Sequence, residues 1–167
     1  DLFATLDFGW STFVMDGGQF QTGGDIGRML IKNGIQTGRS AWSHDGTFAF
    51  RLGGYTTAGL ITLRDWAFVG WQDGPNTGVT KKPGSALLCD SGHAEIDNVG
   101  FYGCTSKRGV ASFHKIKNIV GRRMYFYDDG VLWSTQRRKN GAEGGWIAVA
   151  NGANGPESGT LQGVARF

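Results

Sequence analysis

The sequence predicts an all-β fold built from antiparallel sheets, and three observations predict it. Glycine occupies 29 of the 167 positions and proline only three; glycine is more than twice as frequent as the roughly 7% average, which disfavours long helices. Apolar and aromatic residues come in short clusters, many with the alternation of a strand that packs on one face. Dipeptides typical of tight hairpin turns lie between several of these clusters.

The composition predicts one folded domain over residues 1–167. Hydrophobic residues make up 40% of the chain and charged residues 19%, which is too apolar and too weakly charged for a disordered protein. The net charge of +3 comes without a long basic run, so nucleic acid is not an expected partner. The apolar stretches are far shorter than the roughly 20 residues of a membrane-spanning helix, so membrane insertion is not expected either.

Each apolar cluster is an expected strand. In residues 47–52, for example, Phe48, Phe50 and Leu52 would point to one side and their neighbours to the other. In chain order, the expected strands are 3–8, 12–15, 29–31, 47–52, 60–63, 66–71, 86–89, 94–99, 113–120, 124–127, 131–134, 146–150 and 161–167.

The turn residues favour antiparallel connections between these strands. Asp129-Gly130 and Asn140-Gly141 tolerate the positive φ angles of hairpin turns. The same signal recurs at Asp16-Gly17, Asn33-Gly34 and Asp45-Gly46. Residues 113–134 are expected to form a three-stranded antiparallel meander, with turns at Gly121-Arg122 and Asp129-Gly130, while residues 74–85 and 151–158 are expected loops.

A right-handed parallel β-helix is the alternative fold. It also contains many short strands at regular spacing, and residues 94–99 and 115–120 could be successive coils, 21 residues apart. Parallel coils do not require two-residue turns, however, so the hairpin dipeptides favour the antiparallel sandwich.

The C-terminal half resembles a known superfamily. The run from Phe113-His114 through Tyr125-Phe126-Tyr127-Asp128-Asp129-Gly130 to Trp133 resembles a strand-turn-strand signature of concanavalin A-like lectins and glucanases. Residues 145–149 and 159–167 are similar to the closing strands of laminin-G-like modules. The resemblance covers residues 94–167 and implies a jelly-roll sandwich with a concave face that binds or cleaves polysaccharide.

The glucanases of this superfamily carry three acidic residues on one strand, and here the motif is incomplete. Glu95-Ile96-Asp97 matches its beginning, and a strand would place both carboxylates on one face. The third position holds Val99 in the regular register and Gly100 in the bulged one, so the general acid is missing. If the protein were a hydrolase, Glu95 would be its nucleophile; otherwise Glu95 and Asp97 would hydrogen-bond sugar hydroxyls.

Aromatic side chains supply the other half of the expected glycan site. Indole rings stack on the apolar faces of sugars, although most tryptophans of a β-sandwich belong to its core. Trp42 and Trp71 have the most polar surroundings among the six tryptophans, and we expect them to be exposed. Asp73, next to Trp71 in sequence, and His114 complete the expected site.

Calcium is the one cofactor that the resemblance suggests, because many laminin-G-like domains and lectins bind it. Asp16, Asp45 and Asp128 lie at expected loops or strand ends and are candidate ligands. Cys89 and Cys104 are too few for a zinc site made of cysteine alone; the sequence leaves open whether they form a disulfide or are both buried thiols.

The sequence therefore predicts a non-catalytic, lectin-like module on a secreted protein, cell surface or virion. Its partners would be polysaccharides or the glycans of glycoproteins, with self-association or contacts to assembly neighbours as a further option. One alternative is a β-glucanase-type hydrolase with Glu95 as nucleophile. The other is a structural module of a viral fibre, capsid or cell-surface assembly.

Overall fold

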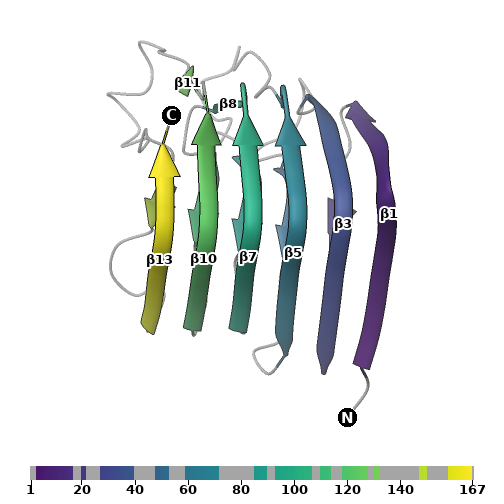
Figure 1. Cartoon of the computed structure of the whole chain (residues 1–167), viewed down its shortest axis with the longest axis vertical. Coiled ribbons are helices and arrows are strands. Elements are labelled where there is room, and N and C mark those ends of the chain that lie inside the picture. Colours follow the sequence, from purple (N-terminus) through teal and green to yellow (C-terminus); the bar gives the residue numbers. More distant parts are fainter. Residues whose placement is uncertain are drawn as a thin grey trace, which may run out of the picture.

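The structure is a computed structural model in which every strand pair that it describes is parallel. It describes residues 3–16, 20–21, 27–39, 48–52, 59–71, 85–89, 93–106, 110–113, 118–127, 130–131, 147–149 and 158–166, and these contain strands and no helix. Six strands lie side by side in one sheet and all point the same way (Figure 1). The second sheet has five strands and lies behind the first.

The chain alternates between the two sheets as a solenoid does. The six-stranded sheet contains, in spatial order, β1 (Phe3–Asp16), β3 (Arg28–Arg39), β5 (Leu60–Val69), β7 (His93–Tyr102), β10 (Asn118–Tyr127) and β13 (Ser158–Arg166). The five-stranded sheet contains β12 (Ile147–Val149), β9 (Ala111–Phe113), β6 (Ser85–Cys89), β4 (Phe48–Leu52) and β2 (Phe20–Gln21). The short strands β8 (Thr105–Ser106) and β11 (Gly130–Val131), which follow β7 and β10 in the chain, form a small third sheet. Each coil therefore adds one strand to each main sheet.

The predicted antiparallel jelly roll is wrong, because every described pairing is parallel. The structure has the parallel coils of the alternative fold, but with a different register. Asn118 lies beside His93, 25 residues earlier, so the proposed coil spacing of 21 is also wrong. The alternation of strands misled the prediction because a solenoid strand, like a sandwich strand, has one buried and one exposed face.

Two predicted turns lie inside strands. Asn33-Gly34 is in the middle of β3 and Gly121-Arg122 is in the middle of β10, so the predicted meander over 113–134 is wrong. Asn33 does adopt the positive φ of 58° that its residue type predicts. There it bends a strand and does not reverse the chain.

The core between the two main sheets is built from side chains stacked coil upon coil. Phe68, Phe101 and Phe126 occupy matching positions in three neighbouring strands. Their ring centroids are 5.1 Å and 4.8 Å apart, and the rings are stacked almost parallel, with interplanar angles of 7° and 6°. Phe50, from the five-stranded sheet, meets this stack at 6.1 Å from Phe68. The parallel register thus stacks identical side chains from successive coils and makes a continuous aromatic column.

Gly34 makes room for one large core side chain. It lies beside Trp66 in the register of β3 and β5, and a methyl group at Gly34 would overlap the Trp66 ring. Trp66 is only 2% exposed and packs edge-on against Phe50 and Phe8. The indole is therefore enclosed by other core side chains and cannot turn out to solvent without disturbing them.

Replacing Gly34 with Ala should destabilise the protein by about 1–3 kcal/mol, the usual cost of overpacking a core. Urea unfolding measures the loss. Gly100→Ala is the matched control, because its added methyl meets the Tyr102 ring, which lies on the surface and can turn aside; we expect a loss below about 0.5 kcal/mol there. Equal losses in the two variants would contradict the argument.

Candidate functional site

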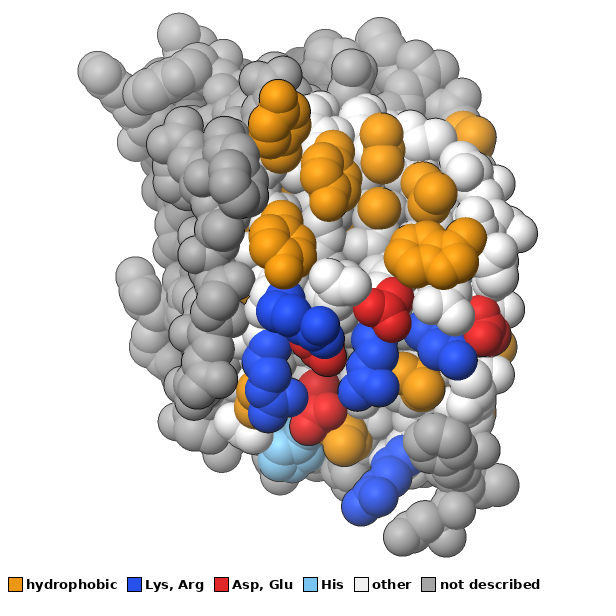
Figure 2. All heavy atoms as spheres, in the orientation of Figure 1, with side chains coloured by type: hydrophobic (Ala, Val, Ile, Leu, Met, Phe, Trp, Pro, Cys, Tyr) orange, Lys and Arg blue, Asp and Glu red, His pale blue; other side chains and the backbone are white. Residues whose placement is uncertain are grey.

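The outer face of the six-stranded sheet carries two bands of side chains that run across the strands. Figure 2 shows charged side chains gathered across the middle of this face and hydrophobic ones above them. Parallel register produces the bands, because residues at one height of each strand line up from coil to coil. Neighbouring strands are about 4.8 Å apart, so each band is a closely spaced row.

A row of residues with positive φ separates the two bands. Asn33, Asp65, Asn98 and Arg123 occupy the same height in β3, β5, β7 and β10, with φ between 50° and 58°. In each strand the left-handed residue breaks the alternation, so two consecutive side chains face outward. We call these four residues the left-handed row.

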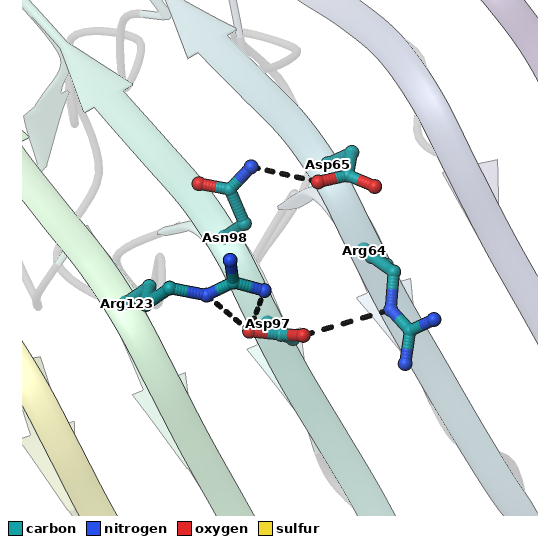
Figure 3. Close-up of polar contacts among 5 residues, drawn as sticks. All are labelled: Arg64, Asp65, Asp97, Asn98 and Arg123. Atoms are coloured by element: carbon teal, nitrogen blue, oxygen red, sulfur yellow. Dashed lines mark hydrogen bonds and ion pairs between the residues drawn. The ribbon is translucent and has the colours of Figure 1, made fainter.

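Asp97 is the centre of the charged band. Its Oδ1 accepts hydrogen bonds from Nε and Nη2 of Arg123, at 2.9 and 2.7 Å. Its Oδ2 lies 3.6 Å from Nε of Arg64. The carboxylate thus lies between guanidinium groups from the strands on either side (Figure 3). These hydrogen bonds raise the pKa of Arg123 further above its ordinary value.

Asp65 and Asn98 join the left-handed row across β5 and β7. Nδ2 of Asn98 donates to Oδ1 of Asp65 at 2.7 Å (Figure 3). The Asn98 amide and the Asp65 carboxylate therefore lie next to the Arg123–Asp97 pair. Together these groups offer hydrogen-bond donors and acceptors on one small area of the sheet.

At the edge of the same band, Asp7 accepts three contacts. Its Oδ1 accepts hydrogen bonds from the backbone N–H of Gly9 and from Nδ2 of Asn33, both at 3.0 Å, and its Oδ2 lies 3.1 Å from Nζ of Lys32. All three favour the ionised carboxylate, the Gly9 hydrogen bond most strongly. They lower the pKa of Asp7 below the ordinary value of 3.8.

The upper band contains an aromatic ring that lies over a glycine. The far end of the Tyr102 ring is positioned over Gly100, where any larger residue would meet it. Tyr102 is nonetheless 41% exposed. In register, Val69 and Tyr127 flank Tyr102 on the neighbouring strands, and Tyr127 is 55% exposed. We call Val69, Gly100, Tyr102 and Tyr127 the aromatic patch.

Glu95 and Asp97 lie on the same outer face of β7, since they alternate with the buried Ala94 and Ile96. The left-handed Asn98 then shifts the alternation, so that Val99 is buried and Gly100 lies under Tyr102. No acidic residue therefore follows them on the outer face of β7. In register, Glu95 has Thr62 and Val120 as neighbours.

The predicted exposure of Trp71 is wrong, because the residue is fully buried. The polar residues that follow Trp71 in the sequence predict a loop, but the indole itself is packed inside the solenoid. Trp42, Asp73 and His114 lie outside the described residues, as do Asp45 and Asp128. Asp16 ends β1, and its side chain is outside the description.

The remaining sequence questions concern metals, thiols and membranes. Among the described residues there is no group of three or more His, Cys, Asp or Glu side chains that could hold a metal ion. Cys89 and Cys104 are both buried thiols. The described part of the chain has no helix of the length and apolarity needed to cross a bilayer.

Comparison with protein-family models, with curated proteins and with solved structures finds no match for this chain.

Sequence reasoning missed Tyr102, Tyr127, Arg64 and Arg123. A signal for Tyr102 was present, because this residue ends β7 and the alternation of that strand places it outward once one residue is skipped. That skip occurs at Asn98 in β7, a residue type that readily takes positive φ. Arg123 gave no such signal, because arginine rarely adopts this conformation.

The Asp7 contacts predict a pH dependence of stability. The pKa of Asp7 is lower in the folded protein than in the unfolded chain, so its stabilising contribution is present above pH 3.8 and lost as the pH falls through the folded value. Urea unfolding of wild type and Asp7→Asn across this range checks the sign. The stability difference should shrink at low pH, where wild-type Asp7 is also neutral; a difference that grows would contradict the assignment.

Proposed function

We propose that the outer face of the six-stranded sheet binds glycan and does not cleave it. The observation that carries the proposal is the Tyr102 ring, which lies over Gly100 while remaining 41% exposed. A ring held against a strand offers its other face to solvent. Such a face can stack on the apolar side of a sugar ring.

Polar groups near this ring suit sugar hydroxyls. Asp65, Asn98 and Arg123 lie on the adjacent left-handed row and offer acceptors and donors held in place by one another. An aromatic surface with a few oriented polar groups is the usual composition of a small-molecule site. Trp10, 53% exposed on β1, is a second ring on the same molecule that could stack on sugar.

The same features support binding over hydrolysis. On β7 the outward residues after Glu95 and Asp97 are Asn98, Gly100 and Tyr102, none of them an acid. Asp97 is engaged with two arginines. A secreted, cell-surface or virion-surface protein would encounter such glycans, and this is the location that we propose.

A glycan array scored together with detection of soluble products tests the proposal. Tyr102→Ala should weaken binding by about tenfold or more, as loss of a central aromatic contact does. Tyr102→Phe keeps the ring and should bind within about threefold of wild type.

Gly100→Ala should weaken binding with little loss of stability, because the added methyl displaces the Tyr102 ring. Val14→Ala, an exposed apolar truncation on β1 at the edge of the sheet, is the control and should bind like wild type.

Other outcomes would select the alternatives. Release of soluble fragments that Glu95→Gln abolishes would replace the proposal with hydrolysis. An obligate oligomer that binds nothing on the array would replace it with a structural role. Binding that is unchanged in Tyr102→Ala would place any glycan site elsewhere on the protein.

A further inference from the structure

The arginines around Asp97 are more exposed than the carboxylate that they surround. Arg64, Arg122 and Arg123 lie beside this carboxylate at two adjacent heights of the sheet. The side chains of Arg64 and Arg123 are 45% and 55% exposed, whereas Asp97 is 14% exposed. Asp65 and Glu95 lie on the same face, so three acidic residues accompany the three arginines. The arginines are exposed and the acidic residues only partly so, which leaves the positive charge more open to solvent.

Arg123 departs from the residue types of its row. Asn33, Asp65 and Asn98 tolerate positive φ, but an arginine at φ 50° is held in a conformation that costs free energy. Backbone strain of this kind persists where the surroundings impose it, and it is concentrated at functional sites. Asparagine would adopt this φ at a lower free-energy cost than arginine. The backbone conformation therefore does not explain why position 123 holds an arginine.

The Arg123 side chain has more hydrogen-bond donors than its contact with Asp97 uses. Arginine has five N–H groups in a planar fork. Two of them, on Nε and Nη2, are directed at Oδ1 of Asp97, while Nη1 points away from Asp97 (Figure 3). Asp97 therefore acts as a positioning residue that orients the guanidinium. The N–H groups of Arg123 that are not directed at Asp97 can donate to a carboxylate or a sulfate.

The position of Arg123 relative to the aromatic patch decides what it could contact. Arg123 has the height of Asn98, two residues before Gly100 on β7, and two residues of a strand span about 6.6 Å. Glu95 lies further from the patch, beyond Asp97. A sugar stacked on Tyr102 would therefore have its substituents beside Arg123, with Glu95 on the far side of Asp97.

We propose that the glycan bound at this face is acidic and that Arg123 recognises its anionic group, a carboxylate or a sulfate. The inference rests on the proposed glycan-binding function and adds the class of ligand. Arg64 and Arg122 supply neighbouring positive charge, and Tyr102 supplies the stacking surface. Arg123 is then the specificity-determining residue of the site.

Three polymers of the same backbone and length test this: dextran, carboxymethyl dextran and dextran sulfate, at physiological ionic strength. Wild type should bind one or both charged polymers more tightly than dextran, and the tighter one identifies the anion. Arg123→Asn should weaken that binding by about tenfold, as loss of a charge-assisted hydrogen bond does. Its urea midpoint should be equal to or higher than that of wild type, because Asn relieves the backbone; a purely structural role would lower the midpoint.

Arg28→Asn is the matched control. It removes the same charge from an exposed position at the start of β3, two strands away from β7, and should change affinity by less than about twofold. Equal losses in both variants would show non-specific attraction to a basic protein and overturn the inference. So would dextran binding as tight as that of the charged polymers, or no binding to either charged polymer.

The two proposals fail separately. Array binding of neutral glycans that depends on Tyr102 but not on Arg123 would keep the glycan site and remove the acidic ligand. Binding of the charged polymers that depends on Arg123 but not on Tyr102 would keep an anion site and remove the stacked sugar.

Discussion

Parallel, in-register stacking of successive coils is the constraint on which the rest of the structure depends. It places Phe68, Phe101 and Phe126 in one column inside the protein. It also places Arg64, Asp97 and Arg123 side by side outside, although they come from three different coils. A core of stacked rings and a banded surface are therefore two consequences of one register.

The left-handed row gives the outer face its division into bands. In β3, β5, β7 and β10 the residue of this row shifts the alternation, so that side chains below and above it face outward on the same sheet. The row lies between the charged groups around Asp97 and the ring of Tyr102. A ligand on this face can contact ionic and aromatic groups together. The positive-φ residue of each strand brings both kinds of side chain to the outer face within a few residues of each other.

Much of the fold could be predicted at the level of strands, and little at the level of pairing. The sequence predicts two strands, at 60–63 and 66–71, but residues 60–69 form one strand that bends at Asp65. The glycine of Gly34 was assigned to a turn, whereas its function is to make room for Trp66 in the core. For the site, Glu95 and Asp97 were found through a motif, while Tyr102 and Arg123 depend on a bend that no motif marks.

The sequence by itself determined that the protein is all-β, which residues of a strand share a face, and that a third acid is missing after Asp97. Only the tertiary structure decided that the strands are parallel and which outward residues are neighbours. The physical reason is that alternation and left-handed backbone preferences are local, and they serve a hairpin and a solenoid equally well. Pairing is not local: the offset between partners is 25 residues for His93 and Asn118 but 40 for Asn118 and Ser158. The length of each connection sets that offset, and no period in the sequence announces it.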